Sequence, residues 1–138
     1  MANNSQRVIL DTNLWISFLI SNDFDKLTQL LIAHKIQLLF STELLEEFLE
    51  VVKRPKLRKY FSESKLNAIM HHINTYAEFI DISSVVTECR DAKDNFLLAL
   101  AQDGNADYLL TGDKDLLVLT NYKNTAIITI SDFYTLHA

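Results

Sequence analysis

Acidic side chains recur at four places where a predicted strand or helix begins or ends. Converging carboxylates repel one another and raise each other's pKa unless a cation lies between them. Such a set therefore indicates a metal site, and hard oxygen ligands favour Mg²⁺ or Mn²⁺ over zinc. The four places are Asp11 after the apolar run "VIL", the stretch "TELLEEFLEVVKR" (42–54), the loop "DAKDN" (91–95) and the turn "TGDKD" (111–115).

Asp11 has the most informative local pattern of these positions. An aspartate that follows a strand commonly caps the next helix. Here Thr12 and Asn13 could also cap that helix, so three capping-type residues stand where one is sufficient. We therefore favour a functional carboxylate at Asp11 and keep capping as the alternative.

The stretch 42–54 holds four glutamates, of which Glu47 is the candidate ligand. On a helical wheel the leucine, phenylalanine and valine side chains of this stretch form one broad apolar arc, and the glutamates lie on the other side. Glu47 lies about 40° from Val51 on that wheel, closer to the apolar arc than the other three glutamates. It can therefore reach inward, whereas Glu43, Glu46 and Glu50 are expected to face solvent.

The last two acidic segments leave more than one interpretation open. Asp91 and Asp94 both precede the apolar helix predicted at 95–103, and either could cap it. Asp113 and Asp115 follow a buried strand, and a type I or II turn would explain them equally well. The four histidines show no ligand spacing and the chain has one cysteine, so oxygen ligands remain the better explanation.

Short apolar strands alternate with helices along the chain, and this order must position the carboxylates. It predicts an α/β fold with a mostly parallel central sheet and helices on both faces. In such sheets the functional crevice lies beyond the carboxyl ends of the strands, where Asp11 and Asp113 both stand. Strands are predicted at 7–10, 36–40, 79–82, 107–111 and 126–130, and helices at 14–19, 27–32, 42–54, 66–80, 95–103 and from 131 onward.

Three helix ends carry local signals. Ser41 or Thr42 is expected to cap the helix at 42–54, and Ser62 the helix that follows Pro55. Gly104 is expected to end the helix at 95–103.

Length and composition indicate one globular domain over residues 1–138. Apolar residues make up 49% and charged residues 22%, and only two glycines and one proline occur. No apolar run approaches the roughly 20 residues that span a bilayer, and the N-terminus lacks a signal-peptide core. A cytoplasmic protein without a membrane partner is expected, and the single cysteine, Cys89, agrees with a reducing compartment.

The formal net charge of −5 argues against nucleic-acid binding until its distribution is considered. Four carboxylates in a metal site would account for much of the negative charge, so an anionic substrate is not excluded. Five of the thirteen basic residues lie within "KRPKLRK" (53–59), which is either a solvated helix end or a phosphate-contacting patch. These five are Lys53, Arg54, Lys56, Arg58 and Lys59.

Taken in order, the acidic segments resemble the PIN-domain family of metal-dependent ribonucleases. The resemblance is greatest to the compact single-domain members that act as toxins in prokaryotic toxin–antitoxin pairs, and it spans essentially the whole chain. It implies a PIN-like, Rossmann-like three-layer sandwich. The matching segments are "VILDTNLWIS", "LLEEFLEVVKRPK", "DAKDNFLLALA" and "ADYLLTGDKDLL".

The resemblance also implies roles for individual residues. Asn13 and Thr111 would orient their neighbours by hydrogen bonds, and Asp115 would assist as a further metal ligand for one or two ions. Close relatives often carry proline where this chain has Ala92, which changes the stiffness of the loop and leaves its carboxylates in place. The family's catalytic and metal-binding acidic residues fall on Asp11, Glu47, Asp94 and Asp113.

The implied activity is metal-dependent hydrolysis of RNA phosphodiester bonds, with 5′-phosphate and 3′-hydroxyl products. The implied partners are an RNA substrate, a cognate antitoxin protein and a second copy of the chain in a homodimer. Two alternatives stay open: a PIN-like module that binds RNA or protein without cleaving, and a haloacid dehalogenase-like phosphatase. The phosphatase would normally carry a second aspartate two residues after the first, where this chain has Asn13.

Overall fold

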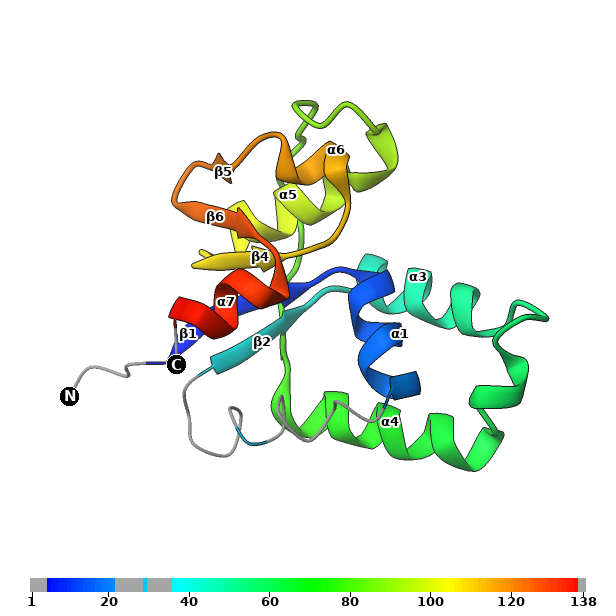
Figure 1. Ribbon diagram of the computed structural model, residues 1–138. Helices are drawn as coiled ribbons and strands as arrows, with labels where there is room; N and C mark the ends of the chain where they lie inside the picture. Colours follow the sequence, from blue (N-terminus) through cyan, green and yellow to red (C-terminus); the bar gives the residue numbers. More distant parts are fainter. Residues whose placement is uncertain (1–4, 22–28, 30–35, 137–138) are drawn as a thin grey trace.

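The computed structural model describes residues 5–21, 29 and 36–136, which form a sheet surrounded by helices (Figure 1). Its strands are β1 (Gln6–Leu10), β2 (Ile36–Phe40), β3 (Glu78–Phe79), β4 (Tyr108–Leu110), β5 (Asn121–Tyr122) and β6 (Thr125–Ile128). The strand order is β3-β2-β1-β4-β6-β5. All neighbours are parallel except β5 and β6 at one edge.

Helices connect these strands and lie around the sheet. In Figure 1, α1, α3 and α4 are drawn to the right of the sheet and α5 and α6 above it. The helix predicted at 27–32 falls outside the described residues. The helices are α1 (Thr12–Ser21), α3 (Thr42–Val52), α4 (Glu63–Tyr76), α5 (Asn95–Asp103), α6 (Lys114–Leu117) and α7 (Ile130–Leu136), with 3₁₀ turns η1 (Arg58–Tyr60) and η2 (Ala92–Asp94).

The central strands are buried on both faces. Val8, Ile9 and Leu10 are successive residues of β1, and none is more than 3% exposed. Since successive side chains of a strand point to opposite faces, both faces of the sheet must be covered. The predicted α/β class, with a mostly parallel sheet between layers of helices, is therefore confirmed.

Two predicted helix starts agree with the structure, and one helix end has a different cause. The hydroxyl oxygens of Ser41 and Ser62 accept the backbone N–H groups of Leu44 and Lys65, both at 3.1 Å. Gly104 does follow α5, but its φ of −92° is open to any residue.

The left-handed conformation after α5 belongs instead to Asn105, with a φ of 52°. Gly104 is needed for a close approach: a Cβ there would lie 3.0 Å from the Leu100 carbonyl oxygen and 3.0 Å from a Leu39 methyl group.

Several predicted boundaries shift. The helix expected through residue 54 ends at Val52, and the one expected through 80 ends at Tyr76. The strand expected at 79–82 is the two-residue β3, which begins one residue earlier, at Glu78, and ends at Phe79. The turn after β4 contains α6. The strand predicted at 126–130 is β6, and its antiparallel partner β5 had no predicted counterpart. Within the described ranges, no helix is long and apolar enough to cross a bilayer.

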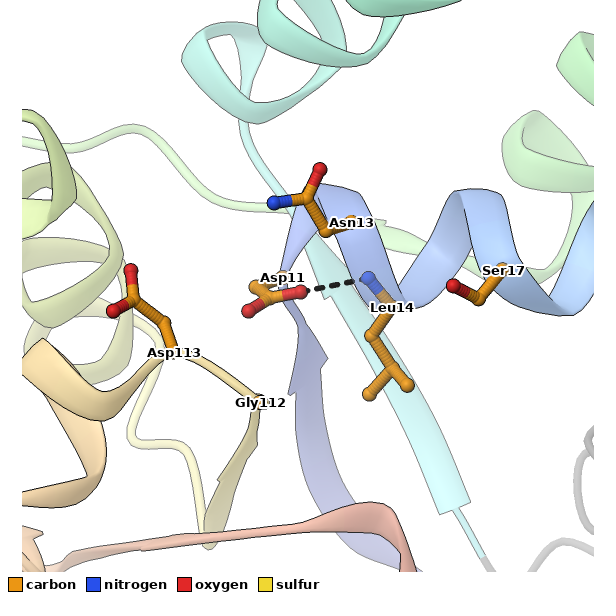
Figure 2. Close-up of a pocket in the computed structure, with 6 residues that line it drawn as sticks. All are labelled: Asp11, Asn13, Leu14, Ser17, Gly112 and Asp113. Carbon is orange, nitrogen blue, oxygen red and sulfur yellow. Dashed lines mark hydrogen bonds between the residues drawn. The ribbon is translucent and has the colours of Figure 1, made fainter. Parts of the chain in front are cut away.

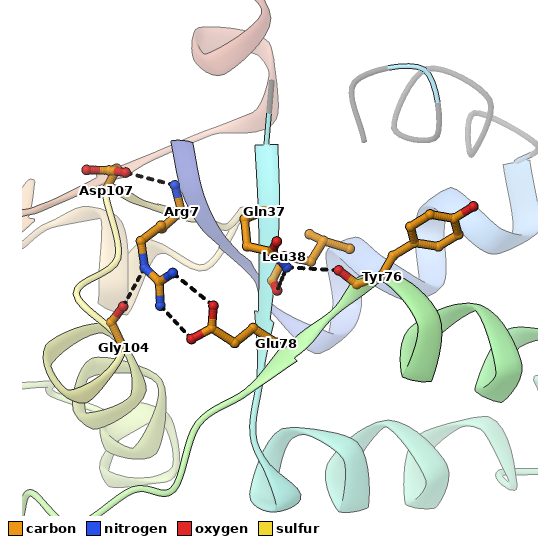
Figure 3. A network of polar contacts seen from close by, with 7 residues as sticks. All are labelled: Arg7, Gln37, Leu38, Tyr76, Glu78, Gly104 and Asp107. Atoms are coloured by element: carbon orange, nitrogen blue, oxygen red, sulfur yellow. Dashed lines mark hydrogen bonds and ion pairs between the residues drawn. The ribbon is translucent and has the colours of Figure 1, made fainter. Parts of the chain in front are cut away.

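Arg7 joins three elements at the edge of the sheet where β1 begins (Figure 3). Its guanidinium binds both carboxylate oxygens of Glu78 at 2.9 and 3.0 Å and donates from Nε to the Gly104 carbonyl at 2.8 Å. The hydrogen bond with Arg7 and its charge hold the pKa of Glu78 below its ordinary value. Asp107 accepts the Arg7 backbone N–H at 2.8 Å. These contacts tie β1, β3 and the end of α5 together.

Candidate active site

The acidic residues meet at the carboxyl edge of the two central strands. Leu10 at the end of β1 is in register with Leu110 at the end of β4. The next residue of each strand therefore lies beside the other, and the Asp11 backbone N–H donates to the Leu110 carbonyl at 3.1 Å. The hydroxyl of Thr111 donates to Asp11 Oδ2. The parallel pairing thus brings together two side chains that are 100 positions apart in the sequence.

Asp11 is held on both carboxylate oxygens and is 8% exposed. Its Oδ1 accepts the Leu14 backbone N–H at 2.8 Å, so Asp11 does cap α1 as the alternative interpretation requires. Burial raises the pKa of Asp11 above its ordinary value, the charge of Asp113 adds to this, and the hydrogen bonds from Thr111 and Leu14 oppose it. Capping and membership of the acidic cluster are therefore compatible.

Glu47 reaches the same region from α3. The hydroxyl of Thr12, at the start of α1, donates to Glu47 Oε1. Glu47 is half-buried, whereas Glu43, Glu46 and Glu50 are exposed. This is the inward position that the helical wheel indicated, and the contact with Thr12 links α3 to the strand end that carries Asp11.

Asp91 and Asp94 differ in their hydrogen bonding in the loop before α5. Asp91 caps η2, since its carboxylate accepts the Lys93 backbone N–H at 3.1 Å. Asp94 precedes α5 but makes no capping hydrogen bond with its side chain. Its Oδ2 is buried and has no hydrogen-bond partner among the described residues. Neither side chain caps α5 itself, and the two aspartates differ in that Asp91 is used as a cap whereas the Oδ2 of Asp94 is left unpaired.

Asp94 and Asp113 interact strongly. Burial, then a hydrogen bond to Asp113 that favours the protonated acid, and then the charges of Asp113, Asp91 and Glu47 raise the pKa of Asp94 to about 7. Two ionised carboxylates have no donor between them, so that hydrogen bond exists only when one carries a proton. A bound cation would reduce the repulsion between this buried carboxylate and the negative charges beside it.

Asp113 caps α6 and is tied to the same threonine as Asp11. Its Oδ1 accepts the Asp115 backbone N–H at 2.9 Å, and its own backbone N–H donates to Thr111 Oγ1 at 2.9 Å. Figure 2 shows Asp113 across from Asp11. Asp11 and Asp113 both line a cleft with a volume of about 370 Å³. The residues that line it are Asp11, Asn13, Leu14, Ser17, Gly112 and Asp113.

Two of the predicted site residues have surroundings that the sequence did not indicate. Asn13 lines the cleft, but its side chain makes no hydrogen bond that would orient a neighbour among the described residues. The Asp115 carboxylate is paired with the Arg90 guanidinium, Oδ1 to Nη2 at 2.8 Å. Sequence reasoning missed Arg90, although a cation directly before the acidic loop was a usable signal. It also missed the contact of Thr12 with Glu47, which has no local signal.

The donor chemistry of the cluster fits a divalent cation, but the side chains are not preassembled around one. Within the described part of the chain, no three acidic, histidine or cysteine side chains are placed to hold one ion together. Thr111, Thr12 and backbone N–H groups occupy oxygens of Asp11, Glu47 and Asp113. The unpaired Oδ2 of Asp94 fits a ligand role.

The predicted basic patch is an exposed surface that runs from the end of α3 through η1. Both of its arginines contact other groups of the chain: Arg54 Nη2 lies 3.8 Å from Glu50 Oε1, and Arg58 Nε donates to the Lys53 carbonyl at 3.1 Å. All of its basic residues are exposed, namely Lys53, Arg54, Lys56, Arg58 and Lys59.

Fold and site together define an α/β domain with an acidic cleft at the carboxyl edge of its sheet. Residues 7–115 match the PIN domain family, and the chain belongs to that family, whose members are generally nucleases. The match includes the whole acidic cluster.

One solved structure with the same fold is the crystal structure of VapBC2 from Rickettsia felis bound to a DNA fragment from their promoter. The TM-score is 0.58 at 17% sequence identity, and the alignment covers 88% of this chain and 97% of that chain. No curated protein matches the chain.

Proposed function

We propose that this chain is a metal-dependent endoribonuclease that hydrolyses RNA phosphodiester bonds. The single observation that carries the proposal is Asp94, whose buried Oδ2 has no partner among the described residues. Asp94 lies beside Asp113 and Glu47, and Asp113 lies beside Asp11. A hard cation would both neutralise the repulsion in this cluster and pair with that oxygen. Membership of a family of nucleases supports the same conclusion.

The proposed ligands for one or two Mg²⁺ or Mn²⁺ ions are the four carboxylates of Asp11, Glu47, Asp94 and Asp113. A bound divalent cation supplies two effects in such sites: it makes water a better nucleophile at neutral pH and stabilises negative charge on the phosphate. Side chains of the chain itself fix the positions of these carboxylates. Thr111 holds Asp11 and Asp113, Thr12 holds Glu47, and one carboxylate accepts the proton of the attacking water.

The biological role proposed is that of a toxin in a toxin–antitoxin pair, acting in the cytoplasm as a single domain over residues 1–138. The structural relative belongs to such a pair, which supports an antitoxin partner for this chain. A homodimer and products with 5′-phosphate and 3′-hydroxyl ends belong to the same proposal. Co-purification of the chain with the product of a neighbouring open reading frame tests the antitoxin partner. The mass of the purified chain by light scattering tests the homodimer.

A cleavage assay tests the central proposal. Purified wild-type protein is incubated with a labelled single-stranded RNA in Mg²⁺, in Mn²⁺ and in EDTA, beside the variants Asp11→Asn and Asp94→Asn. We expect cleavage by the wild type with metal only, and none by either variant although both remain folded by circular dichroism. Equal cleavage by Asp94→Asn would contradict the proposed site. Metal binding without cleavage of any RNA would favour the non-cleaving binding module instead.

A further inference from the structure

Arg90 is a cation placed at the rim of the acidic cluster. Its Nη2 lies 2.8 Å from Asp115 Oδ1, and its side chain is 60% exposed. The other two ion pairs of the described residues lie elsewhere: Arg7 with Glu78 at the opposite edge of the sheet, and Arg54 with Glu50 on α3. An Arg90 guanidinium held on one side by a carboxylate keeps most of its N–H donors directed to solvent.

The backbone around this pair is fixed to the site. Cys89, directly before Arg90, is buried, and its N–H donates to Asn95 Oδ1 at 2.9 Å. Its thiol contacts the Asp115 carbonyl at 3.5 Å. Asp115 in turn donates its N–H to Asp113 Oδ1 at 2.9 Å. Arg90 and Asp115 are therefore joined through part-buried contacts to the cluster, unlike an isolated pair of surface side chains.

An arginine side chain can bind a carboxylate and a phosphate at the same time. Its planar guanidinium offers five donors, so one edge can bind Asp115 while another binds a phosphate oxygen. An RNA strand that enters this cleft meets several carboxylates and needs cations beside them. An isolated surface ion pair adds little to stability, so stability alone gives little reason for this placement.

We propose that Arg90 binds a phosphate of the RNA strand and that Asp115 is a positioning residue that holds Arg90, not a metal ligand. The inference rests on the proposed nuclease function and adds a substrate contact to it. It also replaces the role in metal binding that the sequence indicated for Asp115.

A double-mutant cycle on kcat/KM tests the coupling between the two residues. We expect Arg90→Gln to lower kcat/KM about 10- to 100-fold, the range for loss of one charge-assisted hydrogen bond. Asp115→Asn should lower it less, and the double variant should be no worse than Arg90→Gln, because Asp115 acts only through Arg90. The rise in melting temperature with Mn²⁺ should stay at the wild-type value in all three variants.

A binding measurement separates substrate contact from other effects of Arg90. Affinity for a fluorescein-labelled single-stranded RNA is measured across a salt series in the Asp94→Asn background, so that the RNA stays intact. Removal of one phosphate contact should reduce the log–log salt slope by about 0.7. Lys123→Gln is the matched control, because it removes an exposed cation from the β5–β6 turn at the other edge of the sheet and should leave the slope unchanged.

Three results would overturn the inference. These are loss of the Mn²⁺-dependent stabilisation in Asp115→Asn, additive effects in the double variant, and an unchanged salt slope in Arg90→Gln. Each presupposes a wild type that binds and cleaves RNA. A wild type that does neither would instead contradict the proposed function, so the two failures are distinguishable.

Discussion

The hydroxyl of Thr111 donates to Asp11 Oδ2 while its oxygen accepts the Asp113 backbone N–H at 2.9 Å. One buried side chain thus orients an aspartate after β1 and another after β4. Thr111 is 1% exposed, so water cannot replace it readily. The geometry of the cluster consequently depends on a residue that needs no contact with metal or substrate.

Thr111→Val should therefore impair both stability and cleavage. It removes a donor to Asp11 and an acceptor for Asp113, and leaving such buried groups unpaired costs about 1–3 kcal/mol. Displaced carboxylates should lower kcat/KM by at least tenfold. Thr125→Val is the matched control, since Thr125 is also buried and donates to the Ala106 carbonyl at 2.7 Å, away from the cleft. Urea unfolding and cleavage assays check this; equal activity losses in both variants would contradict it.

Asp94 should make the metal-free protein less stable as the pH rises. Its pKa is about 7 in the folded chain against an ordinary value of 3.8, so the folded state binds more protons between these values. Stability then falls as pH increases from about 4 to 7. The variant Asp94→Asn has no carboxyl group to ionise at this position, so it should not lose stability in this way. Melting temperatures are measured in EDTA between about pH 4 and 7. As the pH rises, the melting temperature of the variant should increase relative to that of the wild type. A difference in melting temperature that stays constant with pH would show that the pKa of Asp94 is not raised.

Divalent metal should stabilise the folded wild type, because it binds the folded state and hardly the unfolded one. The melting temperature should rise with the logarithm of Mg²⁺ or Mn²⁺ concentration. Glu47→Gln should reduce this rise and Glu46→Gln should not, since both lie on α3 but only Glu47 is half-buried beside Thr12. Differential scanning fluorimetry across a metal series gives the answer. An equal rise in both variants would remove Glu47 from the proposed ligands.

The basic patch should contribute to RNA affinity without affecting the metal site. Neutralising Arg54, Arg58 and Lys59 together should weaken RNA binding and lower its salt dependence, because each phosphate contact releases counterions. The metal-dependent rise in melting temperature should stay unchanged. RNA affinity measured over a salt series compares the triple variant with the wild type. Parallel log–log slopes would return the patch to a solvated helix end or assign it to a protein partner.

Local pattern was sufficient for much of this fold. Apolar runs located the central strands, and the capping serines before α3 and α4 were identified correctly because their hydrogen bonds reach only three residues along the chain. The helical wheel selected Glu47, since a residue's face on a helix follows from its spacing alone. The proposal of a metal site followed from the repeated placement of carboxylates at strand and helix ends.

Tertiary structure decided what depends on neighbours distant in sequence. Asp91 and Asp94 look alike in the sequence, and it is burial in the folded chain, together with the approach of Asp113, that raises the pKa of Asp94. The contacts of Thr111 with Asp11 and of Arg90 with Asp115 arise from strand order and loop packing, for which no local spacing rule exists. The physical reason is that hydrogen bonds within one turn are fixed by the backbone of that turn, whereas the environment of a carboxylate is the sum of every element packed around it.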